Sequence, residues 1–380
     1  MHLRKRTDRK KLSMRVLHIY KDYYPVLGGI ENHIKMLAEG QVRRGLDVTV
    51  LVTHPAAGAD ERLIEGVRVV RVKRLATVAS TPLSLSLFVR AARTPVDITH
   101  LHFPYPLGEA ANLLFGRGKK TVITYHSDVI RQRNMLRFYR PLLWRVLRGA
   151  DRIIATSPQY IRSSAYLSQL AEKCEVVPLG VPLERFSQVD ADQVVALRAQ
   201  HPGHIVLFVG RLRYYKGLSY LMDAMREVDA TLLIAGCGPM ETEWRRYAAE
   251  LPWGERIVFC GEVPDELLPA YYQTCDVFVL PASERSEAFG AVQVEAMAAG
   301  KPVVCTELGT GTSFVNENEK TGLVVPARDP VSLSTAINRL LADEELRARL
   351  GAAARTRAWA EFSEEVMVDR VIGVYRSLLG

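Results

Sequence analysis

Hydrophobic and polar residues alternate along the chain in two long series of strand-like and helix-like patterns. The first series begins with the apolar run RVLHIY at residues 15–20. An amphipathic stretch follows at residues 30–44, where Ile30, Ile34 and Leu37 recur near helical spacing. Further strands are predicted at residues 47–53, 67–72, 97–102, 121–125, 151–155 and 175–177. Strands that alternate with helices predict βαβ units and a parallel sheet.

The second series begins with HIVLFVG at residues 204–210 and continues with strand-like runs at residues 230–235, 256–260, 276–280, 302–305 and 322–325. Continuous apolar runs such as VLFVG predict strands that are covered on both faces. The Pro- and Gly-containing segment PLGVPLERFS at residues 178–187 interrupts the rhythm. The sequence therefore predicts an α/β protein with domains at residues 14–182 and 183–360, followed by a helix within residues 361–380.

Size and composition agree with two globular domains. The chain has 380 residues, and single cores stop growing at roughly 250–300 residues. We find no apolar run of the ~18 residues that span a bilayer and no secretory signal after the basic start. The five cysteines lack a CxxC spacing, which favours reduced, buried thiols in the cytoplasm. The net charge of +8 favours an anionic partner. We find no basic sheet interleaved with aromatic residues of the kind that binds RNA, so nucleic acid is not the expected partner.

The segment SERSEAFGAVQVEAMAAGKPVV at residues 283–304 carries the most specific chemistry. Glu287 stands in a turn after a predicted strand, Phe289-Gly290 follows, and Glu295 lies on the next predicted helix. The helix start offers free backbone N–H groups to a phosphate or a polar sugar group, and ligands of open α/β sheets bind at the carboxyl ends of strands. The alternative is that both glutamates are solvated residues at a helix entry. The strand–turn–helix context favours a role of Glu287 and Glu295 in binding a ligand over a solvated helix entry.

Three further groups are candidates. Arg211 and Lys216 follow the strand HIVLFVG and are placed to bind the oxygens of a phosphate group; the alternative is an exposed loop with solvated charges. Gly28-Gly29 permits close backbone approach to a ligand, although paired glycines are more often a turn. His126 ends an apolar strand and is a candidate ligand contact. The alternative, which is more frequent for a lone histidine, is a structural residue whose hydrogen bonds are made by its neighbours.

A metal site is not expected. His100 and His102 alternate in ITHLHFP without an evident third ligand, which favours a structural or pocket-lining role. Asp190-Ala191-Asp192 matches a DxD pattern that can hold a divalent metal, but its place at the start of a helical segment predicts a helix cap. We therefore expect no metal and no cofactor.

A basic face is predicted between residues 131 and 152. On a helical projection of residues 134–148, Trp144 lies with the arginines, opposite the apolar residues, and Pro141 should kink or restart the helix. The alternative to an anionic-lipid surface is a core-facing helix with a solvated basic side. The seven arginines are Arg131, Arg133, Arg137, Arg140, Arg145, Arg148 and Arg152.

Together these motifs resemble the retaining GT-B glycosyltransferases of family four, also called group one. The acidic pair Glu287 and Glu295, with EAFG and EAMAAGKPVV, resembles the family hallmark. VGRLRYYKG resembles its phosphate-binding segment, PVLGGIENH its glycine loop, PLGV its interdomain segment and TYHSD the segment that brings a histidine, here His126, to the donor sugar. The resemblance runs from about residue 15 to the C-terminus and is strongest over residues 204–326.

The resemblance implies two facing Rossmann-like domains with a central cleft, and a C-terminal helix that crosses back to the first domain. It implies that Glu287 contacts the sugar hydroxyls, that the backbone at Phe289-Gly290 supports the sugar, and that Glu295 holds the nucleotide ribose. Gly28, Gly29, Arg211 and Lys216 would complete the donor site. The donor phosphate would help to deprotonate the acceptor.

The implied reaction moves a hexose, with retention, from a nucleoside-diphosphate sugar to a hydroxyl acceptor. The segments SERSEAFG and TYHSD look most like mannosyl- or rhamnosyl-type enzymes of surface polysaccharide assembly, which favours a GDP-sugar and a lipid-linked or polysaccharide acceptor at the inner face of the cell membrane. UDP- and dTDP-sugars remain open. The alternatives are a GT-B sugar-nucleotide epimerase, a phosphorylase, for which no cofactor-holding lysine is marked, and a non-catalytic basic adapter for a membrane.

Overall fold

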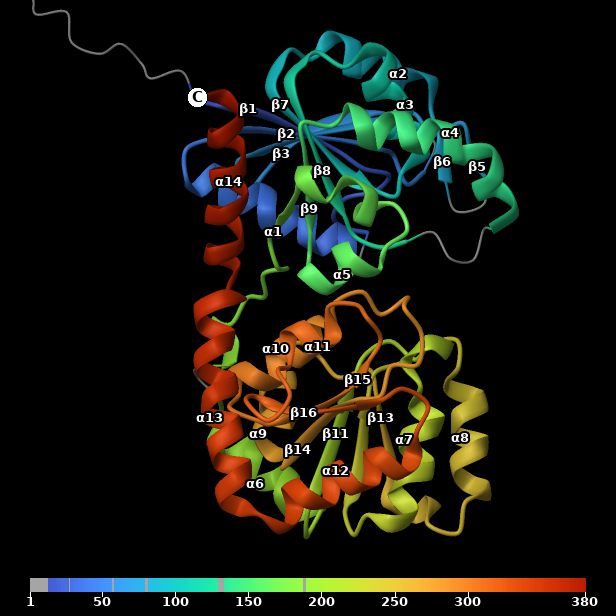
Figure 1. Ribbon diagram of the computed structural model, residues 1–380, viewed down its shortest axis with the longest axis vertical. Coiled ribbons are helices and arrows are strands. Elements are labelled where there is room, and N and C mark those ends of the chain that lie inside the picture. The colour runs from blue at the N-terminus through green and yellow to red at the C-terminus, as the bar shows by residue number, and fades with distance from the viewer. Residues whose placement is uncertain (1–12, 27, 57, 79–80, 129–132, 187–188) are drawn as a thin grey trace, which may run out of the picture. The chain divides into compact units, whose positions relative to one another are not determined.

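The computed structural model describes residues 13–26, 28–56, 58–78, 81–128, 133–186 and 189–380, and of residues 133–138 only the backbone. The chain divides into two compact units (Figure 1). The first unit comprises residues 1–155, 172–175 and 368–380, and the second comprises residues 156–171 and 176–367. The division therefore assigns residues 156–171 and 176–182, which lie before the predicted boundary, to the second unit and the last part of the chain to the first.

An eight-stranded sheet forms the centre of the first unit, in the order β10-β9-β8-β7-β1-β2-β4-β3. The run from β9 to β4 is parallel, and β3 pairs antiparallel with β4. A separate antiparallel pair is formed by β5 (Ala76–Val78) and β6 (Thr81–Leu83). The strands of the sheet are β1 (Arg15–Ile19), β2 (Asp47–Thr53), β3 (Asp60–Ile64), β4 (Val67–Val72), β7 (Val96–Phe103), β8 (Gly118–Tyr125), β9 (Arg152–Ala155) and β10 (Cys174–Val176).

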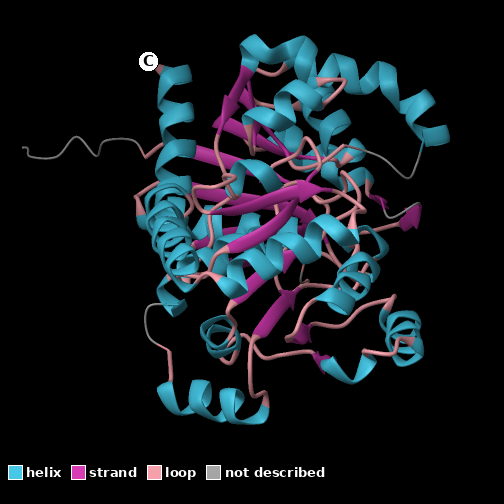
Figure 2. Ribbon diagram, turned by 60° about the horizontal axis from the view of Figure 1, so that its bottom comes forward, coloured by secondary structure: helices cyan, strands magenta, loops and turns pink. Residues whose placement is uncertain are grey.

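Helices cover both faces of this sheet (Figure 2). Successive side chains of a strand point to opposite faces. On β7, His100 contacts Tyr375 of α14, whereas Leu101 shares a small cavity with Asn112 of α3. The face of His100 is therefore covered by α1 and α14, and the other face by α3 and its neighbours. The helices are α1 (Gly29–Arg43), α2 (Leu85–Arg93), α3 (Pro106–Phe115), α4 (Arg133–Gly149) and α14 (Glu364–Leu379).

The last turns of the chain pack closely on α1 within the first unit. A Cβ at Gly40 would lie 2.5 Å from Cγ2 of Val368, so the glycine permits the two helices to approach. Arg44 forms an ion pair with Asp369, and Gln41 Nε2 donates a hydrogen bond of 3.1 Å to the Tyr375 hydroxyl. The C-terminal segment thus completes the cover over the face on which His100 lies.

The second unit has a six-stranded, wholly parallel sheet in the order β13-β12-β11-β14-β15-β16. Four consecutive residues of β11, at positions 205–208, are completely buried, as the continuous apolar run predicted. The strands are β11 (Ile205–Val209), β12 (Thr231–Ala235), β13 (Ile257–Gly261), β14 (Val277–Leu280), β15 (Val303–Glu307) and β16 (Gly322–Pro326).

The helices of the second unit surround its sheet (Figure 2). They are α5 (Pro158–Ser163), α6 (Ala191–Gln200), α7 (Leu218–Ala224), α8 (Glu241–Glu250), α9 (Leu268–Thr274), α10 (Ala291–Ala298), α11 (Thr312–Val315), α12 (Pro330–Ala342) and α13 (Glu344–Glu361). Short 3₁₀ segments are η1 (Leu167–Lys173), η2 (Glu184–Phe186), η3 (Tyr214–Lys216), η4 (Met225–Glu227) and η5 (Gly254–Arg256). Asp190 caps α6 by accepting a 3.0 Å hydrogen bond from the backbone N–H of Asp192, as its position predicted.

Three details differ from the sequence predictions. Strand β3 and the β5–β6 pair were not predicted, because their residues are largely exposed and show no apolar run. Helix α4 continues across Pro141 instead of restarting there. Cys275 and Cys305 are buried as predicted, but Cys174 and Cys260 are half-buried and Cys237 is exposed, so the prediction of buried thiols is wrong at these three positions.

A buried carboxyl group in α3 makes the stability of the first unit depend on pH. Glu109 is 1% exposed, and its Oε1 accepts a 2.8 Å hydrogen bond from the Tyr105 backbone N–H. The Tyr139 hydroxyl donates to its Oε2. Burial raises the pKa of Glu109 from 4.5 to about 7, although both hydrogen bonds act in the opposite direction. The group is therefore protonated in the folded state at pH values at which it ionises in the unfolded chain.

We expect the free energy of unfolding to fall as the pH rises from about 4.5 to 7, by on the order of 3 kcal/mol from this group. Glu109→Gln should remove this dependence, because the amide can accept from Tyr105 and donate to Tyr139. Denaturant titrations at pH 5 to 8 measure the difference, with Glu61→Gln at an exposed position as the control. Parallel stability curves for the wild type and Glu109→Gln would contradict the assignment.

Candidate active site

Two loops of the second unit meet because the strands that precede them are neighbours. Strands β11 and β14 pair in parallel, so their carboxyl ends lie at the same edge of the sheet. The Ser283 backbone N–H donates to the Tyr215 carbonyl oxygen at 2.8 Å. Gly217 has a φ of +65°, and a Cβ there would lie 2.1 Å from the Pro281 carbonyl oxygen. The loop at residues 210–217 therefore contacts the loop at residues 281–290 through the backbone.

This contact brings Lys216 to Glu287. The Lys216 Nζ lies 2.6 Å from Oε2 of Glu287, and each residue is 8% exposed. Burial opposes the charged ammonium, but the Glu287 carboxylate outweighs burial and raises the pKa of Lys216. The two residues form a buried ion pair, and removal of one partner from such a pair costs about 3–5 kcal/mol.

Glu295 is held at both carboxylate oxygens. Arg185 Nη2 donates to its Oε1 at 2.7 Å, and the Tyr272 hydroxyl donates to its Oε2 at 2.7 Å. Burial raises the pKa of Glu295, against the lowering effect of the Arg185 charge. Arg185 and Tyr272 are site residues that sequence reasoning missed, because Arg185 precedes Glu295 by 110 positions and no local spacing links the two.

The turn at Phe289-Gly290 leads into α10. Gly290 has a φ of +77° and precedes the first residue of the helix, a conformation that favours glycine. Phe289 is buried, and the preceding turn is held by the Thr310 hydroxyl, which donates to the Glu287 carbonyl oxygen at 2.7 Å. The Gly311 N–H donates to the Ala288 carbonyl oxygen, also at 2.7 Å. The backbone between the two glutamates is therefore fixed from the neighbouring strand's loop.

Arg211 differs from Lys216 in its exposure. It follows Gly210, whose φ is +148° and whose carbonyl oxygen would lie 2.2 Å from a Cβ at Gly236. The next residue, Leu212, is buried and its N–H donates to the Cys237 carbonyl oxygen at 2.9 Å. The backbone is thus anchored on both sides, while the Arg211 side chain is exposed and can turn toward an anion.

The first unit contains Gly28, Gly29 and His126. Gly28 is the residue before α1, and a Cβ there would lie 2.2 Å from the Glu31 carboxylate, whereas a Cβ at Gly29 would meet nothing within 4 Å. The space at Gly29 could therefore admit a ligand. His126 follows β8, is 7% exposed, and is kept neutral because burial holds its pKa well below the ordinary value.

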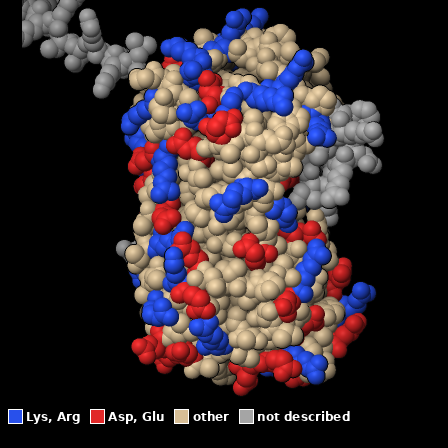
Figure 3. All heavy atoms as spheres, in the orientation of Figure 1, with Lys and Arg blue, Asp and Glu red and all other residues tan. Residues whose placement is uncertain are grey.

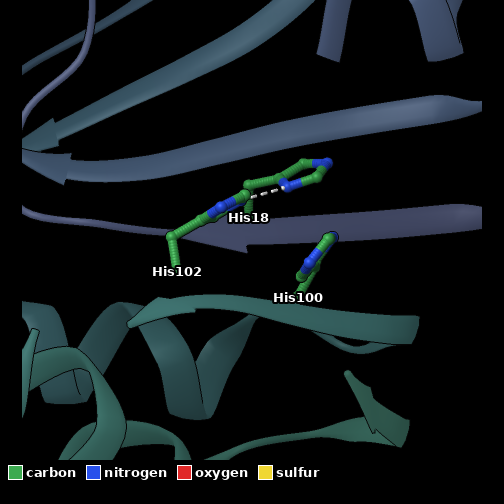
Figure 4. A group of neighbouring side chains, drawn as sticks. All are labelled: His18, His100 and His102. Carbon is green, nitrogen blue, oxygen red and sulfur yellow. Dashed lines mark hydrogen bonds between the residues drawn. The ribbon is translucent and has the colours of Figure 1, made fainter. Parts of the chain in front are cut away.

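His126 belongs to a cluster of five buried histidines, in which His100 and His102 have histidine neighbours that were not evident from the sequence. His18 Nδ1 and His102 Nε2 are 3.0 Å apart, and His100 lies beside them (Figure 4). His102 Nδ1 and His126 Nε2 are 3.2 Å apart, and His33 packs edge-on against His126. His18 of β1 pairs with His100 of β7 in the sheet register, which the two separate sequence motifs did not reveal.

The predicted basic face lies partly outside the described residues, namely at Arg131 and at the side chains of Arg133 and Arg137. Arg140, Arg145 and Arg148 of α4 are exposed, and the Arg148 guanidinium lies 4.9 Å from the centre of the Trp144 ring. On the face drawn in Figure 3, basic and acidic side chains are interspersed. Within the described part of the chain, no helix is both long and apolar enough to cross a bilayer.

Comparison with known proteins places both units in one family. Residues 191–357 match the model described as glycosyl transferases group 1, and residues 27–185 match that of glycosyltransferase family 4. The chain is 37% identical to O-antigen chain mannosyltransferase C of Escherichia coli, over 96% of this chain and 99% of that protein. It is 38% identical to D-rhamnosyltransferase WbpZ of Pseudomonas aeruginosa, over 90% and 91% of the two chains.

The solved structure of sucrose-phosphate synthase from Thermosynechococcus elongatus is similar to the chain with a TM-score of 0.78 and 26% identity, over 96% of this chain and 99% of that one. The two Rossmann-like units are those of the GT-B fold. The chain belongs to the group 1 glycosyl transferases, family 4, and is a glycosyltransferase.

Proposed function

We propose that this glycosyltransferase moves mannose or rhamnose, with retention at the anomeric carbon, from a GDP-sugar to a hydroxyl of a lipid-linked or polysaccharide glycan. The relatives named as an O-antigen chain mannosyltransferase and a D-rhamnosyltransferase support this choice. The observation that carries the proposal is the buried Lys216–Glu287 pair beside the Glu295 site, at the carboxyl edge of a parallel sheet.

In this proposal, the second unit binds the donor through charges that are already fixed. Glu287 accepts hydrogen bonds from sugar hydroxyls with the oxygen that Lys216 leaves available. Lys216 has three N–H donors, so it can contact the diphosphate while it stays paired with Glu287. Arg211 supplies a planar fork to the phosphate oxygens. Fixed cations act on the growing charge of the leaving diphosphate without reorganisation.

The ribose would be held by Glu295. Arg185 donates to one carboxylate oxygen of Glu295 and Tyr272 donates to the other. An ionised carboxylate can accept about four hydrogen bonds, so about two acceptor positions are left. The remaining lone pairs can accept the two ribose hydroxyls. Arg185 and Tyr272 therefore serve as positioning residues that fix the carboxylate in one orientation.

His126 would meet the sugar through a defined nitrogen. His18 Nε2 donates to Gln41 Oε1 at 2.8 Å, so the Nδ1 of a neutral His18 must accept from His102 Nε2. His102 Nδ1 must then accept from His126 Nε2, because a neutral imidazole has one donor and one acceptor. The Nδ1 of His126 is left as an acceptor that suits a sugar hydroxyl, and the chain of hydrogen bonds fixes this tautomer.

We also propose that the enzyme works without a divalent metal and at an anionic membrane surface on the cytoplasmic side. The DxD aspartate Asp190 serves as a helix cap, and Arg211 and Lys216 supply cations where a metal would otherwise act. The exposed Arg140, Arg145 and Arg148, together with Trp144, form a basic and aromatic surface on α4 of the kind that binds anionic headgroups.

Glu287→Gln should lower turnover by about 10²–10³-fold with a smaller effect on nucleotide binding, because Glu287 contacts the sugar. Glu295→Gln should weaken nucleotide binding by about 1.5–3 kcal/mol, because it removes one charged hydrogen-bond acceptor. Release of nucleotide from a panel of GDP-, UDP- and dTDP-sugars, with calorimetry for binding, separates the two effects. Glu284→Gln, at a half-buried position three residues away whose carboxylate pairs with Arg328, is the matched control. Small and equal effects of both substitutions would sink this division of roles.

Activity should survive an excess of EDTA, and Asp190→Asn with Asp192→Asn should be nearly silent in turnover. Arg211→Ala and Lys216→Ala should each lower turnover by about 10²–10³-fold, because each removes one fixed charge at the diphosphate. Initial rates with and without chelator measure the first effect. Loss of activity in EDTA that Mn²⁺ restores would overturn the metal-free mechanism.

Binding to vesicles that contain anionic lipid should weaken as salt rises, since surface charges are screened within ~8 Å at physiological ionic strength. Replacement of Arg140, Arg145 and Arg148 by Ser should abolish the binding. Vesicle sedimentation measures it, and neutral vesicles serve as the control. A variant that still sediments like the wild type would reject this surface.

A further inference from the structure

His33 is a buried imidazole whose two ring nitrogens have no hydrogen-bond partner among the described residues. It lies one turn into α1 and is 6% exposed. Its ring packs edge-on against those of His102 and His126, with centroids 5.8 and 5.0 Å away. A buried polar nitrogen without a hydrogen-bond partner is energetically costly. The edge-on packing of His102 and His126 does not satisfy the two nitrogens of His33, so this site calls for a ligand that does.

His33, His102 and His126 present one nitrogen each within 4.8 Å of one another. His102 Nδ1 and His126 Nε2 are 3.2 Å apart. Two imidazole nitrogens at about 2.0–2.1 Å from a tetrahedral Zn²⁺ are separated by roughly 3.3–3.4 Å. The spacing that serves a hydrogen bond in the metal-free protein therefore also fits one edge of a metal tetrahedron.

The neighbouring triad of His18, His100 and His102 is less suitable (Figure 4). Both nitrogens of His18 are engaged, by His102 and Gln41. Both nitrogens of His100 are engaged as well, by the Tyr375 hydroxyl at 2.5 Å and the Thr124 hydroxyl at 2.6 Å. A metal at this triad would break several hydrogen bonds, whereas a metal at His33 would replace one and satisfy His33.

The chemistry of the three ligands selects the class of metal. Burial lowers the pKa of His33 to about 3 and holds those of His102 and His126 well below their ordinary value, so the imidazoles are neutral at pH 7, as metal ligation requires. Neutral imidazoles favour Zn²⁺, Cu²⁺, Ni²⁺ or Co²⁺ over Mg²⁺ and Ca²⁺, which prefer oxygen. Three such ligands leave a fourth position for water.

We propose that His33, His102 and His126 form a binding site for a divalent transition metal such as Zn²⁺, and that its occupation reverses the tautomer of His126. His102 ligates with the lone pair of Nδ1 and keeps its proton on Nε2, toward His18. His126 must give up its Nε2 proton to ligate, so the proton moves to Nδ1. That nitrogen then donates where it accepted, and the contact offered to the donor sugar is changed.

The site itself does not depend on the proposed function, whereas the effect on sugar transfer rests on it. A bound ion would link α1, β7 and the residue after β8. It would therefore act as an inhibitor that stabilises the first unit, distinct from the metal-free catalysis proposed above.

Metal binding is measured on the full chain without an affinity tag, after treatment with EDTA and removal of the chelator. Calorimetry with Zn²⁺ should give one ion per chain, and Co²⁺ should give the intense visible absorption of a tetrahedral site. His33→Phe should weaken Zn²⁺ binding by at least ~100-fold, as should His126→Asn, because loss of an outer-shell partner alone costs 10–100-fold. His33 makes no hydrogen bond, so His33→Phe is expected to fold; circular dichroism and thermal unfolding check this.

The matched control is His201→Ala with His204→Ala, at two histidines of the second unit that are not buried, and it should keep the wild-type affinity. Zn²⁺ should raise the unfolding temperature of the wild type by about 5–10 °C at 100 times its Kd, and leave His33→Phe unchanged. It should lower sugar transfer by the wild type but not by His33→Phe.

Absence of a stoichiometric Zn²⁺ site, or equal affinity in His33→Phe and the wild type, would overturn the proposal. Binding that requires His33 without any change in sugar transfer would retain the site and reject the change of tautomer. A chain that transfers no sugar under any condition, yet binds one Zn²⁺ through His33, would refute the proposed function and leave the metal site standing.

Discussion

The contact between the loops after β11 and β14 is the constraint on which the candidate donor site depends. These strands are neighbours in the sheet although about 70 residues separate them, and glycine at position 217 permits the approach of the Pro281 carbonyl. The ammonium of Lys216 is thereby brought to Glu287 in a place from which water is largely excluded. Each charge is stabilised in this buried place by the other, and the backbone contact between the loops brings the two side chains together.

The segments around that pair are held by further hydrogen bonds that do not involve Lys216. The turn before α10 is anchored at Glu287 and Ala288 by hydrogen bonds from the loop after β15. Glu295, one further turn along, is held by Arg185 and Tyr272. A charge that must stabilise a transient state acts best when its position is fixed beforehand. The architecture therefore fits electrostatic catalysis better than a flexible loop of solvated charges would.

Much of the fold could be predicted from the sequence, because the parallel strands are continuous apolar runs. The runs at residues 47–53 and 67–72 agree residue for residue with β2 and β4. Strand β3 could not be predicted, since it is an exposed edge strand whose stability comes from pairing with β4. Glu287 and Lys216 could be named from their motifs, but their direct contact could not, because it depends on strand order. The partners of His102 were missed for the same reason, whereas Arg185 and Tyr272 were missed because no local spacing links them to Glu295.

The buried Lys216 of the second unit stays charged, whereas the buried histidine cluster of the first unit is neutral. In the second unit, burial is offset by opposite charges, so Lys216 remains charged. In the first unit, no carboxylate offsets the burial of the described histidine rings. Desolvation is the largest cause of the lowered pKa of each of the five rings. A neutral imidazole has one donor and one acceptor nitrogen. The hydrogen bonds of His126, His102 and His18 therefore all run in one direction, with each ring donating toward Gln41. Gln41 Oε1 is the acceptor at one end of this chain, and the Nδ1 lone pair of His126 is left at the other, so the acceptor at Gln41 sets the tautomer that His126 adopts.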